Sequence, residues 1–98
     1  MNNLENNITL SKYNKKLEVI TGSIEKIEDI NNSKYMKYVY VKDDCNNIYK
    51  TMINIRHTGN LNIKNKITIE GVAIKFFDYY KLISYKIYYN KRKFSIRY

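Results

Sequence analysis

The chain has 98 residues, of which eleven are tyrosine and one is cysteine, and it contains no proline or tryptophan. A chain of this length builds one domain with a small core. One cysteine excludes an internal disulfide framework, and Cys45 with His57 falls short of the roughly four ligands of a structural zinc site. No apolar run reaches the about 18 residues of a membrane span, and the Asn-rich start lacks the apolar segment of a signal peptide. We therefore expect a cytoplasmic protein that uses no metal or other cofactor.

The formal net charge is +9, and the whole excess of positive charge lies in the second half of the chain. Residues 1–44 carry seven lysines and seven acidic residues, whereas residues 45–98 carry eleven lysines and arginines against only Glu70 and Asp78. A composition rich in Asn, Lys, Ile and Tyr is also typical of an A/T-rich genome, but that bias should act on both halves alike. The asymmetry therefore favours an anionic partner.

The first 30 residues predict an arm followed by a long strand. Residues 1–16 are polar with isolated apolar positions, which predicts an N-terminal arm. Residues 17–30 (LEVITGSIEKIEDI) begin with period-two alternation, and isoleucine then recurs at every third position. This pattern fits either a short helix beginning at Ser23 or one long strand with a bulge, bent at Gly22. We favour the strand, because the helix would have fewer than three turns between β-branched residues.

The clearest pattern in the chain is a β-hairpin over residues 35–55. Residues 35–42 (YMKYVYVK) alternate strictly, and residues 48–55 (IYKTMINI) form a matching strand. Between them lies Asp-Asp-Cys-Asn-Asn, composed of residue types that accept tight turns.

The remaining strands are predicted at residues 67–77 and 82–89, with a connection at 56–66 and a loop at 78–81. Residues 90–98 form either a basic tail or a sixth short strand. We place one of the adjacent Phe76 and Phe77 in the core. Alternation assigns the following further residues to the interior: Val39, Val41, Tyr49, Ile53, Ile55, Ile67, Ile69, Ile83 and Ile87.

This order of strands resembles the oligonucleotide-binding (OB) fold. TGSIEKIEDI resembles its bent first strand, KYVYVKDDCNNIYKTMI its second and third strands, and LNIKNKITIEG the entry to its fourth. The last segment departs from the family, since Asn65 replaces a common Asp and Lys64 a common Gly. The resemblance implies an all-β, five-stranded Greek-key barrel over residues 17–89, with a short connection between strands 3 and 4. SH3-like and Sm-like barrels share the strand count, whereas a winged-helix domain would need more helices.

In OB-folds the face of strands 2 and 3, with the loops joining strands 1–2 and 4–5, binds oligonucleotides. Lys and Arg neutralise phosphates there, and aromatic rings stack on unpaired bases. The resemblance therefore implies a binding surface composed of the outward-facing residues of this region and of the tail. The candidates are Tyr38, Tyr40, Lys42, Lys50, Met52, Arg56, Phe77, Tyr79, Tyr80, Lys81, Lys91, Arg92, Lys93 and Arg97.

Each of these signals has a simpler structural interpretation. Tyrosines on an outer face often pack across strands, and a basic terminus is often only solvated. The pair Tyr79–Tyr80 could equally anchor a protein partner. The acidic pairs occur in predicted turns, His57 lies in a Gly/Asn loop, and Cys45 follows two aspartates instead of the basic residues that activate a nucleophilic thiol. We therefore expect no enzymatic activity.

We therefore predict a non-catalytic protein that binds single-stranded nucleic acid, DNA rather than RNA, beside a polymerase or helicase. It resembles accessory OB-fold proteins of mobile elements or phages. The alternatives are a protein-interaction module that docks on such an enzyme without touching nucleic acid, and binding of duplex DNA. Neither a membrane nor a small-molecule substrate is expected.

Overall fold

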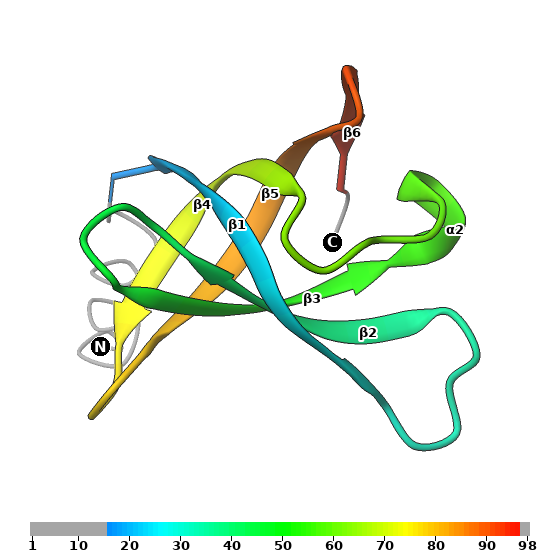
Figure 1. Ribbon diagram of the computed structural model, residues 1–98, viewed down its shortest axis with the longest axis horizontal. Helices are drawn as coiled ribbons and strands as arrows, with labels where there is room; N and C mark the ends of the chain where they lie inside the picture. Colours follow the sequence, from blue (N-terminus) through cyan, green and yellow to red (C-terminus); the bar gives the residue numbers. More distant parts are fainter. Residues whose placement is uncertain (1–15, 97–98) are drawn as a thin grey trace, which may run out of the picture.

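The computed structural model describes residues 16–96, which form an all-β barrel with one short helix (Figure 1). Residues 1–15 of the predicted arm (residues 1–16), and Arg97 of the predicted binding surface, lie outside the described residues. The elements are β1 (Glu18–Asp29), β2 (Met36–Lys42), β3 (Ile48–Asn54), α2 (Ile55–Thr58), β4 (Lys66–Lys75), β5 (Tyr80–Tyr89) and β6 (Arg92–Ser95).

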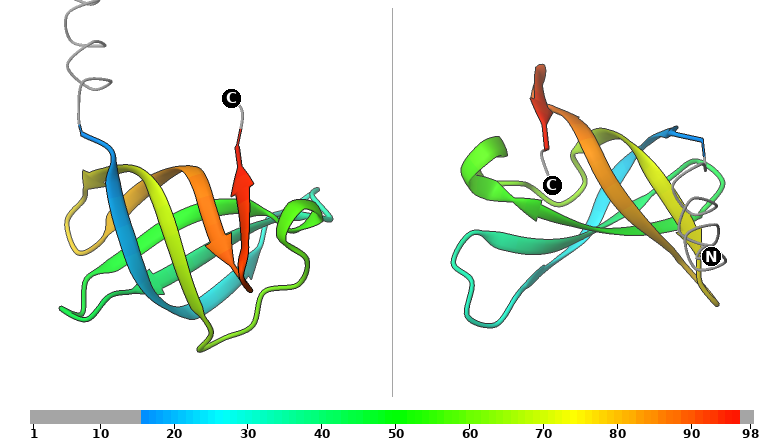
Figure 2. Two further views of the ribbon diagram at one scale, coloured as in Figure 1. Left: turned by 90° about the horizontal axis from the view of Figure 1, so that it is seen from above. Right: turned by 180° about the vertical axis from the view of Figure 1, so that it is seen from behind.

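Five strands close into a barrel, and β6 extends the sheet beyond it. The strand order is β3-β2-β1-β4-β5-β6, with antiparallel neighbours throughout, and a parallel pairing of β3 with β5 completes the circle. In the left view of Figure 2, β1, β4, β5 and β6 lie side by side while β2 and β3 cross behind them. The predicted fold class is confirmed: a closed five-stranded barrel with a short connection between β3 and β4, compatible with an OB-like fold.

β1 is long because it serves two walls of the barrel. Its first half pairs with β4 and its second half with β2. At the bend, a Cβ on Gly22 would collide with the backbone carbonyl of Lys42 and a methyl of Val41. The register against β2 shifts between Ile24 and Lys26, as a β-bulge does. The prediction of a bulged strand is therefore confirmed, and the alternative of a helix from Ser23 is wrong.

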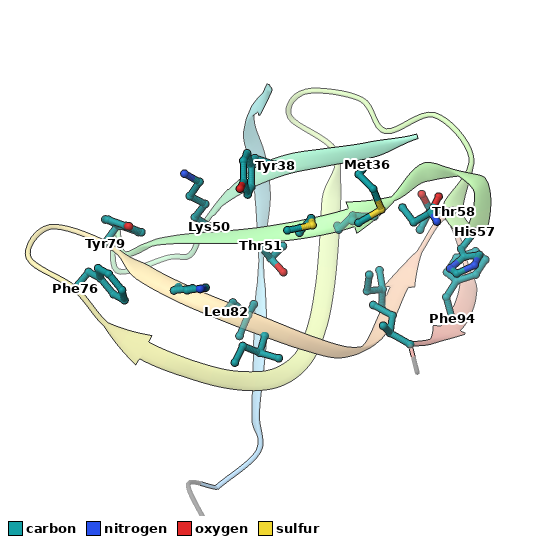
Figure 3. A pocket seen from close by; sticks show the side chains of 17 residues that line it. Met36, Tyr38, Lys50, Thr51, His57, Thr58, Phe76, Tyr79, Leu82 and Phe94 are labelled. Atoms are coloured by element: carbon teal, nitrogen blue, oxygen red, sulfur yellow. The ribbon is translucent and has the colours of Figure 1, made fainter. Parts of the chain in front are cut away.

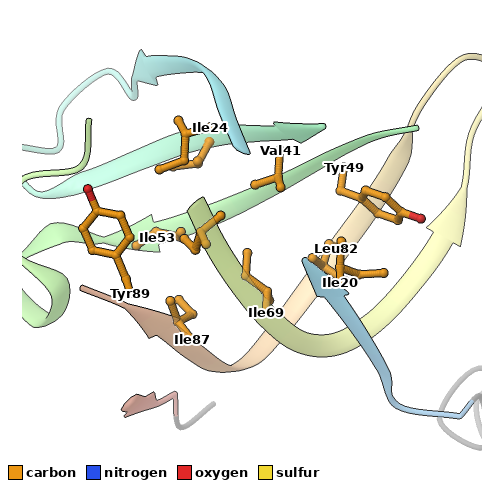
Figure 4. Close-up of a cluster of buried hydrophobic side chains, with 11 residues drawn as sticks. Ile20, Ile24, Val41, Tyr49, Ile53, Ile69, Leu82, Ile87 and Tyr89 are labelled. Carbon is orange, nitrogen blue, oxygen red and sulfur yellow. The ribbon is translucent and has the colours of Figure 1, made fainter. Parts of the chain in front are cut away.

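Alternation placed most of the barrel core correctly, and Figure 4 shows the main cluster of its buried hydrophobic side chains. Predicted core residues that are buried are Val39, Val41, Tyr49, Ile53, Ile67, Ile69 and Ile87. Further buried apolar residues are Ile20, Ile24, Val72, Leu82 and Tyr89. Inside the barrel, the hydroxyls of Thr51 and Ser84 share a hydrogen bond, which satisfies two polar groups in an apolar core.

Two core positions assigned by alternation are wrong. The register of β5 against β4 shifts next to Gly71. Before the shift the even-numbered Leu82 and Ser84 are buried, whereas after it the odd-numbered Ile87 is buried. Ile83 is consequently only half-buried, because the shift reverses the alternation on which its assignment depended. Ile55 is also half-buried, because β3 ends at Asn54 and Ile55 begins α2.

Neither Phe76 nor Phe77 is in the core, contrary to prediction. β4 ends at Lys75, and both phenylalanines lie in the loop before β5, 44% and 97% exposed respectively. The two-residue alternation that required one ring to face inward applies only within a strand. These rings are therefore available to a partner.

The turn between β2 and β3 is organised by the Asp43 carboxylate. It accepts hydrogen bonds from the backbone N–H groups of Cys45 and Asn47, both at 2.9 Å, and from the Asn47 side-chain amide at 3.1 Å. The Tyr49 hydroxyl lies 3.4 Å from the same carboxylate. Burial acts to raise the pKa of Asp43, but these hydrogen bonds outweigh it and hold the pKa below its ordinary value.

A two-residue turn returns the chain after β5. Asn90 and Lys91 have φ of 57° and 65°, and Tyr89 pairs with Arg92 on either side of them, the geometry of a type I′ hairpin. Residues 92–95 therefore form the short extra strand that was one of the two alternatives for this segment. The Ile96 N–H donates to the Tyr85 carbonyl at 2.8 Å and holds the end of the hairpin against β5.

Replacing Gly22 by alanine should test the bend in β1. The added Cβ meets the Lys42 backbone, which cannot move aside as a side chain could. We expect a loss of about 2–3 kcal/mol of unfolding free energy in urea denaturation. The control is Ser23→Ala, since the Ser23 hydroxyl makes one 3.3 Å contact with Glu25; its cost should stay within about 0.5 kcal/mol. An equal loss of stability in the two variants would contradict the close approach of Gly22 to the Lys42 backbone.

The Asp43 turn predicts a defined pH dependence. Because the folded pKa of Asp43 is lowered, its contribution is complete above the unfolded pKa of about 4 and is lost as pH falls through the folded pKa. Asp43→Ala should therefore cost about 1–2 kcal/mol at pH 7. Urea unfolding from pH 7 to pH 2.5 should show the difference from the native chain shrinking at the acid end. A difference independent of pH would contradict this assignment.

Candidate nucleic-acid interface

A groove of about 560 Å³ opens between β3 and β5 (Figure 3). The two strands pair only at Tyr49–Tyr80 and Lys50–Lys81 and then diverge, so that α2 and β6 form the far walls. The groove is lined by Met36, Tyr38, Lys50, Thr51, Met52, Ile53, Asn54, His57, Thr58, Phe76, Tyr79, Lys81, Leu82, Ile83, Ile87, Phe94 and Ile96. Figure 3 places Phe76 and Tyr79 at one end, and His57 and Phe94 at the other.

One end, which we call the aromatic end, combines rings with cations: Tyr38, Lys50, Phe76, Tyr79 and Lys81. The Phe76 and Tyr79 rings lie 5.2 Å apart and are tilted by 31°, and the Phe76 N–H donates to the Tyr79 carbonyl at 2.8 Å, which closes the loop. The Lys50 ammonium lies 4.3 Å from the centre of the Tyr38 ring. A hydrogen bond with the Tyr40 hydroxyl is the largest cause that raises the pKa of Lys50 above its ordinary value.

The other end, which we call the apolar end, is lined by Met36, Met52, Ile83, Phe94 and Ile96. Met52 stands on the outer face of β3 and is 45% exposed, although its side chain is apolar. Phe94 and Ile96 reach the groove because the hairpin folds the chain back along β5. This end therefore offers apolar contacts rather than charge.

Tyr40 belongs to a network on the barrel wall and does not line the groove. Its hydroxyl donates to Glu28 Oε1 at 2.8 Å, and Lys26 Nζ lies 2.9 Å from Glu28 Oε2 and 5.3 Å from the centre of the Tyr40 ring. The hydrogen bond between Lys26 and Glu28 raises the pKa of the lysine and lowers the pKa of the carboxyl. Tyr40 thus packs β2 against β1.

Tyr80 likewise holds the barrel together. Its ring stacks on Tyr49 with the centroids 4.9 Å apart and the planes inclined by 20°, and Lys75 Nζ lies 4.8 Å from the Tyr80 ring centre. Tyr49 is buried, and that burial raises the pKa of its hydroxyl to about 12. The predicted pair Tyr79–Tyr80 is therefore divided, with Tyr79 in the groove and Tyr80 in the closing contact of the barrel.

Of the predicted surface, the structure brings together in the groove Tyr38, Lys50, Met52, Tyr79 and Lys81. Phe77 projects into solvent from the loop and does not line it. Lys42 ends β2, half-buried, and Arg56 lies on α2 with its guanidinium 4.8 Å from the Tyr35 ring centre. Lys91, Arg92 and Lys93 are exposed on the β5–β6 hairpin, outside the groove lining.

Sequence reasoning missed the groove residues contributed by α2 and β6. His57 was assigned to a loop without function, and Phe94 and Ile96 were placed in a segment predicted as a basic tail or a sixth short strand, with no role in a groove. The available signal was the alternation after Asn90, which fits a returning strand. It was weak because Lys91 is an unusual residue for the positive φ that this turn requires.

No metal centre or membrane-spanning helix accompanies the groove in residues 16–96. Nowhere in that range do three or more His, Cys, Asp or Glu side chains gather in a way that could hold a metal ion. No helix in the same range is long and apolar enough to cross a membrane.

Comparison with family models, with curated proteins and with solved structures finds no match for this chain.

Proposed function

We propose that the protein binds single-stranded nucleic acid, DNA in preference to RNA, in the groove between β3 and β5. One observation carries the proposal. Tyr38, Phe76 and Tyr79 stand beside Lys50 and Lys81 in one open groove, and no Asp or Glu is among the described residues that line it. Ring faces for bases and cations for phosphates thus occur side by side, as single-strand binding requires.

The groove favours an unpaired strand over a duplex. Aromatic rings inside a groove reach a base only after it has left its stack, which is costly in a duplex. None of the rings at the aromatic end is needed for barrel closure, since the Tyr49–Tyr80 stack provides that contact. Stacking on such rings tolerates any base, so binding through the aromatic end would have little sequence preference.

The exposed loop before β5 supports a second, compatible candidate: docking on a protein. Phe77 is 97% exposed, which has no folding benefit, and isolated aromatic anchors are enriched at protein interfaces. We propose that a polymerase or helicase is the partner. The barrel would then tether single-stranded DNA to that enzyme and raise its local concentration.

Alanine substitutions in the loop should separate the groove from the exposed tip. Phe76→Ala and Tyr79→Ala each remove a stacking surface, so the Kd for labelled oligo-dT should rise by about 5- to 100-fold in fluorescence anisotropy. Phe77→Ala is the matched control and should bind like the native chain, since Phe77 does not line the groove. A loss confined to Phe77→Ala would move the binding site to the loop tip and contradict the groove.

The lysines of the groove should make the affinity for single-stranded DNA depend on salt, each phosphate contact adding to that dependence. If Lys81 contacts a phosphate, Lys81→Ala should weaken binding and reduce the slope of log K against log salt by about 0.7. The control is Lys66→Ala, an exposed lysine of β4 that does not line the groove, for which the slope should not change. No binding of oligo-dT by the native chain at about 50 mM salt would refute the proposed function, because phosphate contacts are strongest there.

A further inference from the structure

The apolar end of the groove offers few free hydrogen-bonding side chains. Three polar residues line it: Asn54, His57 and Thr58. Asn54 Oδ1 already accepts from the Arg56 N–H at 2.9 Å, where it caps α2. The Thr58 hydroxyl donates to the Gly59 carbonyl at 2.8 Å. Asn54 Oδ1 and the Thr58 hydroxyl proton are thus already engaged, and most of the side chains that line this end are apolar, so recognition here depends mainly on apolar contact.

The apolar end is continuous with the aromatic end, so a strand that stacks on Tyr79 would continue along β3 toward Met52. The cations at both ends of the groove favour a negatively charged strand along its whole length. Lys50 and Lys81 border one end of the groove, and exposed Arg56 lies on the helix that walls the other. A polyanion with apolar projections fits this combination of cationic borders and an apolar floor.

Among the bases, thymine alone carries a methyl group on its exposed edge, and apolar side chains are its usual contacts. Methionine suits this role, since its unbranched thioether adapts to irregular surfaces. Uracil has the same edge without the methyl. Burying one additional methyl group is worth about a fourfold change in affinity.

We infer that the apolar end reads the C5-methyl group of thymine through Met52 and Met36. The preferred ligand is then thymine-rich single-stranded DNA rather than a strand that contains uracil. This inference rests on the proposed function and adds to it a ligand class and the residues that select it.

The test compares labelled oligo-dT with oligo-dU of equal length, about 12 nucleotides, in fluorescence anisotropy. The two strands share the deoxyribose backbone and differ only in the methyl group. We expect oligo-dT to bind at least about fourfold more tightly. Equal affinities would overturn the inference but leave the proposed function standing, whereas no binding of either strand would overturn both.

The variant Met52→Gln tests whether Met52 causes the preference for oligo-dT. Glutamine has a similar length, and an exposed position should tolerate the substitution. The variant should lose most of the preference for oligo-dT over oligo-dU, so that the ratio of the two Kd values falls from about fourfold toward one. Ile63→Gln is the control: Ile63 is 46% exposed and lies outside the groove lining, so the preference should persist. A preference that survives Met52→Gln unchanged would overturn the assignment of the methyl group to the apolar end.

Discussion

The closing contact between β3 and β5 determines both the barrel and the groove. It is a parallel pairing of two residue pairs, reinforced by the stack of Tyr80 on Tyr49. The Tyr49 hydroxyl lies within reach of Asp43, which orders the preceding turn. Deeper in the barrel, Thr51 and Ser84 bridge the same two strands after their backbones have separated. A longer pairing would have sealed the wall, whereas this short one closes the barrel and leaves the remainder of both strands lining an open surface.

Five tyrosines around this contact divide into two groups by what they contact. Tyr40, Tyr49 and Tyr80 are engaged with neighbouring strands through Glu28 or through each other. Tyr38 and Tyr79 line the groove. Residue type and position on an outward face do not distinguish these groups, because Tyr38 and Tyr40 lie on the same face of one strand. What distinguishes them is a hydrogen-bonding partner on a neighbouring strand. The Tyr40 hydroxyl donates to Glu28 on β1.

Sequence periodicity was sufficient for the barrel and insufficient for its irregular parts. The hairpin of β2 and β3 followed from alternation, since each strand buries one face and the polar turn fits between them. Ile83 could not be placed, because the register shift next to Gly71 depends on how closely two backbones approach. Phe76 was misplaced because strand β4 ends two residues earlier than its apolar character suggests. The outer faces of β2 and β3 made only one side of the groove predictable, whereas the wall formed by Phe94 and Ile96 depends on a turn with an atypical residue.

The placement of β6 has a consequence for motion. Among the described strands it pairs only with β5, over four residues, and the closing contact of the barrel does not involve it. Short peripheral strands occupy the low end of local stability, so opening this hairpin should cost less than unfolding the barrel, although Phe94 and Ile96 pack against the core. The width of the groove then depends on this local equilibrium. Any occupant that contacts Phe94 and Ile96 stabilises the hairpin by mass action, so filling the groove and ordering its wall become a single event.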